Sequence, residues 1–386
     1  MIAPVPFFEP RGTPISILER LRVLSTFCHN IDLVTYHVGE DIELENVTIH
    51  RTPKLKHIKQ VPVGPSLIKL LLDLILSVKV LALLIKGEYN LIHSNEEGAL
   101  IGAIYSRIFR IPHLYDCHSS LPDVLENFGY KRYLIFKRVL KLIERLIIRN
   151  SDAIITISPG LTEYVRSISK EIPIVTIENI KEPIDLSTVS REDMVNTKKL
   201  YSINKNNSIV LYTGTFENYQ GLDLLLSSAK LINNFNQDII FILAGGDKKQ
   251  VELYKKKSLD LGLNNHVYFT GKIPQEEILV LLKISDVLVS TRIRGMNPPL
   301  KIYSYLQSGK PIVATNIIAH TQVLNSHVAC LVKPEAVNFS DGIMCIIEDK
   351  VYAKTIAKNA KDYYKKKFSQ NSNLDKLKKI ISVAIK

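Results

Sequence analysis

The chain has 386 residues, 46% of them hydrophobic and 23% charged, and a formal net charge of +12. This length suits about two domains, each large enough to bury a core of its own. The four cysteines, Cys28, Cys117, Cys330 and Cys345, lie far apart without a CxxC pair, which argues against a disulfide framework or a zinc site and fits a reducing compartment.

The positive charge favours polyanionic partners, which are nucleic acid, an anionic membrane or phosphorylated substrates. The sequence contains no Trp and no alternation of basic and aromatic residues, so nucleic acid is the least expected of the three. The start, MIAPVPFFEPRG, has no basic region followed by an apolar run. We therefore expect no signal peptide and a cytoplasmic protein.

The first half is predicted to alternate short strands with helices. Apolar and β-branched runs predict strands near 1–4, 31–36, 47–51, 89–93, 113–118, 151–158 and 173–177, and helical spacing predicts helices over 15–25, 99–109 and 130–149. Proline and glycine make residues 7–14 a loop, where Gly12 would let a ligand approach the backbone. An ordinary turn glycine is the alternative.

Residues 65–85, PSLIKLLLDLILSVKVLALLI, form the most apolar stretch of the chain. Its length approaches that of a membrane span, but Lys69, Asp73 and Lys79 interrupt it, and charges inside a span are costly. We therefore predict a long helix, which either packs against a sheet or lies partly on a bilayer surface. Packing on a sheet is the favoured alternative because the helices of a parallel sheet cover its faces.

Two histidines fall where predicted strands end, His93 on the strand over 89–93 and His118 on the strand over 113–118. Ligands of open α/β sheets lie beyond the carboxyl ends of the strands. The pair is therefore a candidate for a site, although a lone histidine is more often structural.

The predicted helix over 130–149, YKRYLIFKRVLKLIERLIIR, is basic and amphipathic. Basic amphipathic helices often lie on anionic lipid. A solvated helix face is the alternative.

The second half repeats the alternation of strands and helices. Strands are predicted over 209–214, 239–247, 266–271, 285–289 and 312–315, with helices over 222–232 and 275–283. The pattern in both halves predicts an α/β fold of two doubly wound parallel sheets facing each other across a cleft. The predicted domains cover 1–179 and 207–365, with a polar linker over 180–206 and a C-terminal helix over 366–386 that packs back on the first domain.

Residues 289–316, VSTRIRGMNPPLKIYSYLQSGKPIVATN, join the end of a strand to a loop with Arg292 and Arg294 and then to a helix carrying Lys301. Fixed cations beside a helix N-terminus form an anion site, which would suit the two neighbouring phosphates of a nucleotide sugar. A plain strand–loop–helix with a solvated basic loop is the alternative.

The second half resembles the retaining glycosyltransferases of family 4, which have the GT-B fold of two Rossmann-like domains. The matching segments are LYTGTFENYQGLDLLL, FILAGG, VYFTGKIP, ISDVLVS and PLKIYSYLQSGKPIVATN, in the family's order and spacing. The first half matches more loosely, through PRGTP, LIHSNEEGAL, LYDCHSSLP and SDAIITISPGL. Together these segments span nearly the whole chain.

The resemblance implies retaining transfer of a hexosyl group from a UDP- or GDP-sugar to a lipid-linked or glycan acceptor in polysaccharide biosynthesis, without metal or cofactor. The donor would lie on the second domain, along Gly214, Thr215, Gln220, Gly246, Gly271, Lys272, Ile273, Pro299, Leu300 and Ser304. His118 would lie by the transferred sugar, and Arg11, Gly12 and His93 would line the acceptor side.

The sequence departs from the family pattern at four positions. Thr215 and Gln220 stand where the family usually has an Arg and a Lys, and Met296 and Ser304 replace its two glutamates. A serine can still bond a ribose hydroxyl, but a methionine cannot replace a carboxylate. We expect that Arg292, Arg294 and Lys301 supply the missing positive charge, because a leaving diphosphate needs cations.

The basic helices and the net charge add an anionic membrane surface to the expected partners, with the protein peripheral on the inner face of the cell membrane. Two other functions fit the same fold. A non-catalytic binding or partner subunit is favoured by the missing glutamates, and a nucleotide-sugar epimerase is disfavoured because the carboxylate cluster we would expect there is missing from the sequence.

Overall fold

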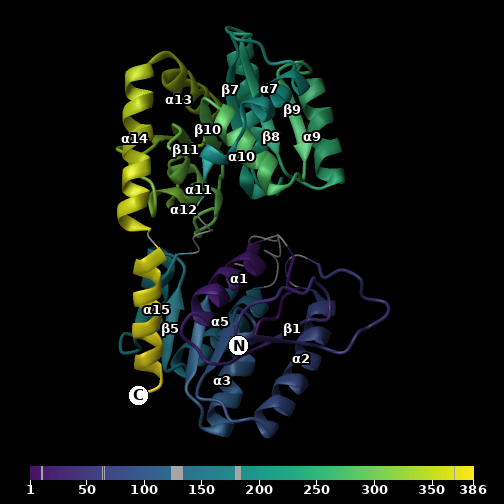
Figure 1. The fold of residues 1–386 in the computed structure, drawn as a ribbon, viewed down its shortest axis with the longest axis vertical. Helices are drawn as coiled ribbons and strands as arrows, with labels where there is room; N and C mark the ends of the chain where they lie inside the picture. Colours follow the sequence, from purple (N-terminus) through teal and green to yellow (C-terminus); the bar gives the residue numbers. More distant parts are fainter. Residues whose placement is uncertain (10–11, 63, 65, 123–133, 179–183, 369) are drawn as a thin grey trace. The chain divides into compact units, whose positions relative to one another are not determined.

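The computed structural model describes the chain except residues 10–11, 63, 65, 123–133, 179–183 and 369. The chain divides into two compact units (Figure 1). Unit 1 comprises Met1–Lys181 and Gln370–Lys386, and unit 2 comprises Glu182–Ser369.

The sheet of unit 1 is parallel throughout its named strands. β1 (Ile31–Thr35) pairs with β2 (Val47–Arg51), and a second ladder runs in the order β3 (Ile92–Asn95), β4 (His113–Cys117), β5 (Ala153–Thr156) and β6 (Ile174–Thr176). Ile2 joins the ladders through parallel bridges to Val34 and Ser94. The strand order therefore reverses between the N-terminal segment and β3, which is where open α/β sheets bind ligands.

The described helices of unit 1 are α1 (Gly12–Ser25), α2 (Leu67–Lys86), α3 (Gly98–Phe109), α5 (Leu134–Arg149), α6 (Pro159–Ile168) and α15 (Gln370–Ala384). Ser66 caps α2, with its side chain accepting from the Lys69 amide, as expected for a serine N-cap. Within the described part of the chain, no helix is both long and apolar enough to cross a bilayer. The C-terminal helix α15 packs on β4, β5 and β6.

Unit 2 has a parallel sheet in the order β12, β11, β10, β7, β8, β9. The bounds are β7 (Ser208–Thr213), β8 (Ile239–Ala244), β9 (Val267–Gly271), β10 (Val287–Ser290), β11 (Ile312–Thr315) and β12 (Cys330–Val332). Counted from β7, this is the Rossmann order 3-2-1-4-5-6, and the strand order reverses between β7 and β10. The strands read as continuous apolar runs because both faces are covered.

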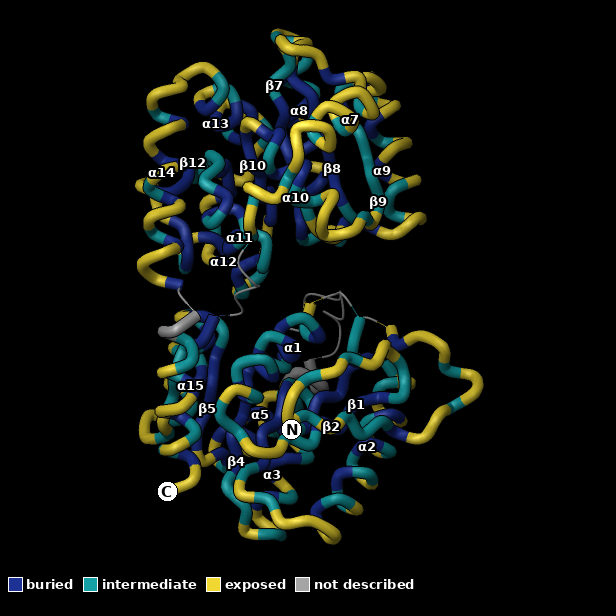
Figure 2. Tube along the Cα trace, viewed as in Figure 1, coloured by how far each residue is buried: buried dark blue, intermediate teal, exposed yellow. Residues whose placement is uncertain are grey.

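The helices of unit 2 are α7 (Arg191–Leu200), α8 (Leu222–Asn233), α9 (Lys248–Asp260), α10 (Gln275–Ile284), α11 (Lys301–Ser308), α12 (Ile318–Thr321), α13 (Ala336–Glu348) and α14 (Lys350–Lys367). Two short 3-10 helices, η1 (Leu186–Thr188) and η2 (Asn218–Gln220), complete the unit. Its core packs α8 and α13 against the sheet. Figure 2 shows the central strands, such as β4 and β5 in unit 1 and β8 and β10 in unit 2, as buried.

Two predicted boundaries in unit 1 were wrong. The strand predicted over 89–93 is β3, Ile92–Asn95, so His93 lies inside the strand and not at its end. Tyr89 lies outside the strand, and its hydroxyl donates to Asp32 at 2.6 Å. The predicted loop over 7–14 ends earlier than expected, because α1 begins at Gly12.

The segment predicted as a linker, 180–206, holds η1 and α7 in its described part. Ser190 caps α7 by accepting from the Asp193 amide, and Glu192 and Asp193 occupy the first turn. Serine followed by acidic residues is a helix-start signal that the polar composition of the segment obscured. α7 packs on α10, so this segment is part of unit 2.

Candidate functional site

The candidate site of unit 2 lies where β7 and β10 end side by side. The two strands pair in parallel, Val210 with Val287 and Leu211 with Leu288. Gly214 follows β7, and the loop that begins at Thr291 follows β10. Because this is the point where the strand order reverses, the sheet leaves a crevice there for a ligand.

Lys301, the first residue of α11, places its ammonium group in this crevice. Nζ lies 3.5 Å from the centre of the Tyr212 ring and 3.3 Å from the point that a Cβ on Gly214 would take. The atom is buried and has no hydrogen-bond partner among the described residues. Burial, with Arg292 nearby, holds the pKa of Lys301 well below its usual value. A buried cation without an acceptor is costly, so an anion bound beside Nζ would stabilise it.

Arg292 is buried and uses its guanidinium group to hold its own loop. Nε donates to the carbonyl oxygen of Arg294 at 3.0 Å, and Nη1 donates to that of Asn297 at 2.7 Å. The guanidinium carbon lies 4.9 Å from the centre of the Tyr219 ring. A side chain at Gly295 would collide with Nη2, since its Cβ would come within 2.7 Å. Arg292 therefore adds positive charge near Lys301 and fixes the loop, while Arg294 is exposed.

The segment after β7 is tied to the same loop. Thr291 Oγ1 donates to the carbonyl oxygen of Gln220 at 2.8 Å, and the Tyr212 hydroxyl donates to the carbonyl oxygen of Thr215 at 2.8 Å. The side-chain nitrogen of Gln220 lies 3.4 Å from Thr215 Oγ1, while its side-chain oxygen is buried without a partner among the described residues. Thr215 and Gln220 thus lie together, beside Tyr212.

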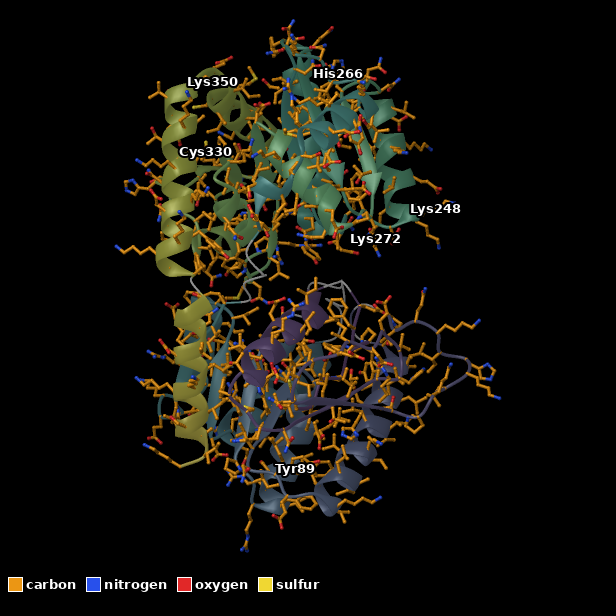
Figure 3. The ribbon with its side chains drawn as sticks, in the orientation of Figure 1. Tyr89, Lys248, His266, Lys272, Cys330 and Lys350 are labelled. Atoms are coloured by element: carbon orange, nitrogen blue, oxygen red, sulfur yellow. The ribbon has the colours of Figure 1, made fainter. Side chains whose placement is uncertain are left out.

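Further predicted donor residues lie at the carboxyl ends of β8 and β9. Gly271 ends β9 with φ of +69°, and the space where its Cβ would lie is open. Gly246, with φ of +76°, lies against the Phe216 ring, 2.5 Å from where its Cβ would be. Figure 3 shows Lys272 and Lys248, which follow β9 and β8, at one end of the unit, and His266, which precedes β9, at the other.

The other residues predicted on this side belong to the start of α11 and the turn after β9. Pro299 is buried, Leu300 is the N-cap residue of α11, and Ser304 is half-buried one turn beyond Lys301. Lys272 is exposed and Ile273 is half-buried.

Unit 1 carries a buried ion network at the carboxyl end of β4. Asp116 is fully buried; its Oδ2 lies 2.9 Å from Arg20 Nε and 3.3 Å from His93 Nε2, and its Oδ1 lies 3.2 Å from His118 Nε2. Burial alone would raise the pKa of Asp116, but Arg20 and the histidines hold it well below its usual range. Burial lowers the pKa of His93, although Asp116 acts in the opposite direction. The network fixes both imidazole rings.

Glu96 lies at the reversal point of this sheet, directly after β3. Its φ of +45° is rare for a residue with a side chain, and such backbone conformations gather at functional sites. Thr13 Oγ1 of α1 donates to its Oε1 at 3.1 Å. Burial and the neighbouring Glu97 raise the pKa of Glu96, with His118 acting against them. Glu97 in turn pairs with Lys69 of α2 at 2.9 Å.

His93 and His118 were predicted as a pair, and both imidazole rings lie beside Asp116. Arg20, Glu96 and Asp116 were not predicted as site residues. Asp116 lies in the segment LYDCHSSLP, near the end of a predicted strand and two residues before His118. That position could have identified it as a site residue. Arg20 gave no such signal, because it reads as an exposed helix position. Gly12 begins α1 with open space beside it, and Arg11 lies outside the described residues.

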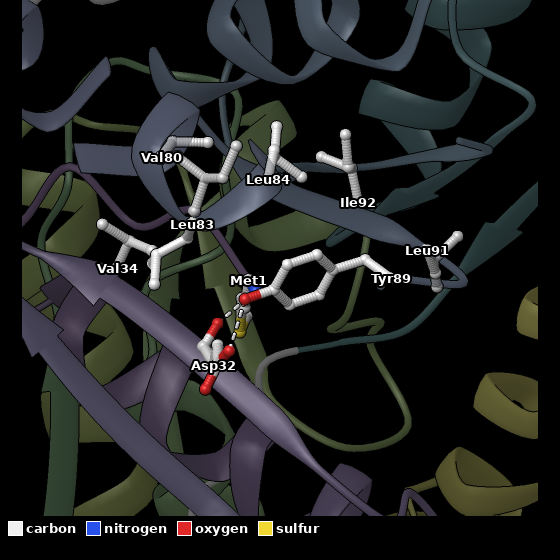
Figure 4. Close-up of a pocket in the computed structure, with 10 residues that line it drawn as sticks. Met1, Asp32, Val34, Val80, Leu83, Leu84, Tyr89, Leu91 and Ile92 are labelled. Atoms are coloured by element: carbon white, nitrogen blue, oxygen red, sulfur yellow. Dashed lines mark hydrogen bonds between the residues drawn. The ribbon is translucent and has the colours of Figure 1, made fainter. Parts of the chain in front are cut away.

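A small cavity in unit 1 is separate from these residues (Figure 4). It measures about 30 Å³ and is lined by Met1, Asp32, Tyr89 and aliphatic side chains of α2 and β3. That volume holds no more than a few water molecules, so it is not a sugar or nucleotide site. Across the described ranges, no group of three or more His, Cys, Asp and Glu side chains is arranged to hold a metal ion.

Comparison with protein families gives two matches that together cover most of the chain. Residues 10–181 match the model described as Glycosyltransferase Family 4, and residues 195–363 match Glycosyl transferases group 1. Two proteins of Methanocaldococcus jannaschii are similar in sequence. The uncharacterized glycosyltransferase MJ1178 is 26% identical over 86% of this chain and 84% of its own length. The uncharacterized glycosyltransferase MJ1069 is 26% identical over 62% of this chain, and the match spans only 60% of that protein.

Solved structures with this fold cover nearly the whole chain. Anabaena Alr3699/HepE, solved in complex with UDP and glucose, superposes with a TM-score of 0.76 at 18% identity over 99% of this chain and 98% of that one. Sucrose-phosphate synthase of Thermosynechococcus elongatus superposes with a TM-score of 0.78 at 20% identity over 98% and 95%. The predicted fold class is confirmed.

Proposed function

The chain belongs to glycosyltransferase family 4 and has the GT-B fold, and on that premise we propose that it is a retaining hexosyltransferase using a nucleotide-diphosphate sugar. The donor, a UDP- or GDP-sugar, binds unit 2. The acceptor is a lipid-linked or other glycan and binds unit 1. The protein works in the cytoplasm, peripheral to the inner face of the cell membrane.

The observation that carries this proposal is the unpartnered ammonium of Lys301. It is buried beside the exposed Gly214, at the reversal point of a Rossmann sheet. A diphosphate in this crevice would supply the missing acceptor and would reach a charge-assisted hydrogen bond. As the glycosidic bond breaks, negative charge grows on the leaving diphosphate, and a fixed cation in a dry site stabilises that charge most.

The other residues of unit 2 take supporting roles in the proposal. Arg292 keeps the loop in place and adds a second positive charge near the diphosphate. Gly271 lets the donor approach the backbone, because the space beside its Cα is open. Ser304, half-buried and one helical turn beyond Lys301, bonds a ribose hydroxyl. Unit 1 supplies His118 to the transferred sugar, with its ring held by Asp116.

A non-catalytic subunit is the second candidate, and one observation favours it. Met296 and Ser304 replace two family glutamates, and Met296 is exposed, with its carbonyl oxygen accepting a hydrogen bond from the Gln322 side chain. Such a subunit would keep the fold and the anion crevice without transferring sugar.

The test is release of nucleoside diphosphate from a panel of UDP- and GDP-sugars, with proton NMR of the product to establish the anomeric configuration. We expect turnover of one donor with retention. The Lys301→Met substitution should lower kcat by about 100- to 1000-fold. Lys256→Met, which removes an exposed lysine of α9, is the matched control and should keep kcat within about twofold of the wild-type value.

Two outcomes would count against the proposal. Turnover with inversion would remove the retaining assignment. Absence of turnover, together with thermal stabilisation by nucleoside diphosphates that depends on Lys301, would identify the non-catalytic subunit instead.

A further inference from the structure

Helix α2 is apolar on two opposite faces. One stripe faces the core of unit 1 and consists of Leu72, Leu76, Val80 and Leu84. The opposite stripe is exposed and consists of Leu67, Leu70, Leu71, Leu74, Val78 and Ile85. Leu67 is 83% exposed and Leu74 65%. A helix that packs on a sheet normally exposes polar residues to water. The second apolar stripe therefore suggests that another molecule covers this face.

The helices beside α2 continue the exposed apolar surface. α2 packs next to α3, and α3 next to α5; the hydroxyls of Ser77 and Tyr105 meet at 2.8 Å between the first two. All three belong to successive right-handed crossovers, so they lie on one face of the sheet. Exposed side chains here are Leu100, Ile104 and Ile108 on α3 and Val139, Leu142 and Leu146 on α5. We call these residues, with the exposed stripe of α2, the apolar face.

Positive charge borders the apolar face on both sides. On the α5 side the exposed residues are Arg138, Lys141, Arg145 and Arg149. On the α2 side an exposed loop carries Lys54, Lys56 and Lys59, and its Leu55 and Ile58 pack against the core that α2 covers. The carboxylates of these helices point elsewhere: Asp73 of α2 accepts from the Tyr36 hydroxyl, and Glu144 of α5 is buried.

We propose that the apolar face docks on the surface of an anionic lipid bilayer. Large apolar side chains framed by lysine and arginine are the signature of helices that lie in the interface plane. A second copy of the chain would cover the same leucines but would bring the two cationic borders together, and like charges oppose that contact. Acidic headgroups complement both borders.

Docking would place one end of α2 at the headgroups, and that end adjoins the acceptor side of unit 1. Lys69, in the first turn of α2, pairs with Glu97 at the end of β3. Glu97 follows Glu96, whose carboxylate accepts a hydrogen bond from the Thr13 hydroxyl. A sugar hydroxyl on a lipid carrier would therefore reach this edge without leaving the membrane surface. This consequence rests on the proposed function. The docking specifies the surface behind the peripheral location in that proposal, and it does not depend on sugar transfer.

The experiment is co-sedimentation of the full chain with vesicles of phosphatidylcholine, alone or mixed with phosphatidylglycerol. The wild-type protein should bind the mixed vesicles and should be released by salt, which screens the charges. The triple substitution Leu70→Gln, Leu74→Gln and Val78→Gln should weaken binding about 100-fold. Arg138→Gln with Arg145→Gln and Arg149→Gln should also weaken it by up to about 100-fold.

The matched control places glutamine at Leu253, Leu259 and Val337, which are exposed apolar residues of unit 2. That variant should bind vesicles as the wild type does. Release of nucleoside diphosphate in solution should be unchanged in all three variants, which separates failure of docking from failure of the proposed function. Circular dichroism on heating checks that each variant is folded.

Equal vesicle binding by the α2 triple variant and the wild type would overturn the proposal. So would sedimentation equilibrium showing a wild-type dimer that the triple substitution dissociates, since a second copy would then be the partner. Binding to neutral vesicles as tight as to mixed ones would also contradict the charge argument.

Discussion

Both units place candidate residues at the carboxyl ends of their parallel strands, but they satisfy the charges there differently. In unit 1, Asp116 is surrounded by Arg20, His93 and His118. In unit 2, Lys301 has the Tyr212 ring and the positive Arg292 as neighbours and no acceptor in the part of the chain that the structure describes.

This contrast separates two kinds of buried charge. A buried charge that is paired within the protein holds its neighbouring side chains in a fixed arrangement without a ligand. A buried charge without partners destabilises the empty protein and stabilises the occupied one. The charges at this edge of unit 1 are therefore paired within the protein, whereas in the proposed function the buried ammonium of unit 2 is paired by the diphosphate of the donor.

The largest expected effect comes from breaking the satisfied network. Asp116→Asn should lower the free energy of unfolding by about 3–5 kcal/mol, because Arg20 would remain buried without its counter-charge. Calorimetry or urea unfolding measures this. Asp223→Asn is the control; its carboxylate is exposed and pairs with Lys257, so its removal should cost at most about 1 kcal/mol.

The same network gives a pH dependence with a definite sign. The pKa of Asp116 is well below its usual range in the folded protein, so its contribution is complete above the unfolded pKa of about 3.9. The contribution is lost as pH falls through the depressed folded value. If Asp116→Asn and Asp223→Asn lowered the free energy of unfolding equally at neutral pH, Asp116 would not be the paired buried charge on which the comparison of the two units depends.

A smaller effect of opposite sign is expected in unit 2. Lys301→Met should raise the free energy of unfolding of the empty protein by about 1–2 kcal/mol, because it removes a buried amine without an acceptor. Lys310→Met is the matched control, since Lys310 Nζ donates to the carbonyl oxygens of Lys283 and Ser285 at 2.8 and 2.7 Å. That substitution should lower the free energy by about 1–3 kcal/mol. The same sign for both would show that Lys301 is already satisfied.

The smallest expected effect is the uptake of a proton when a nucleoside diphosphate binds. The pKa of Lys301 is well below its usual value in the empty protein, and a bound diphosphate should raise it. Between the empty and the bound pKa, binding of UDP or GDP should take up close to one proton, and affinity should fall as pH rises, by at most about tenfold per pH unit. Titration calorimetry in Tris and in Hepes measures the uptake, which Lys301→Met should abolish.

Much of the fold could be predicted because parallel strands are buried on both faces. Runs such as those of β7 and β8 read as continuous apolar segments and leave little choice of structure. α7 was missed because polar composition suggested a linker, although Ser190 and its acidic neighbours mark a helix start. The linker prediction was based on the polar composition of the segment and ignored the N-cap at Ser190.

The candidate site was predictable in its residue types and not in its partners. Lys301 was expected to be a cation of the site, but its stacking on Tyr212 joins residues from different strands and helices. The Arg20–Asp116 pair joins positions 96 residues apart, which no local pattern reveals. Arg292 was expected to face a phosphate, and the structure shows its guanidinium bonded to two carbonyl oxygens of its own loop.

The position of α15 has a consequence for synthesis of the chain. Its side chains Leu377, Ile380 and Ala384 share a core with Leu114 and Ile155 of unit 1, so that core is incomplete until α15 has left the ribosome. Unit 2 lies between the two segments of unit 1 in sequence, so all of its residues are synthesised before α15. The nascent chain would therefore complete its second Rossmann unit before its first.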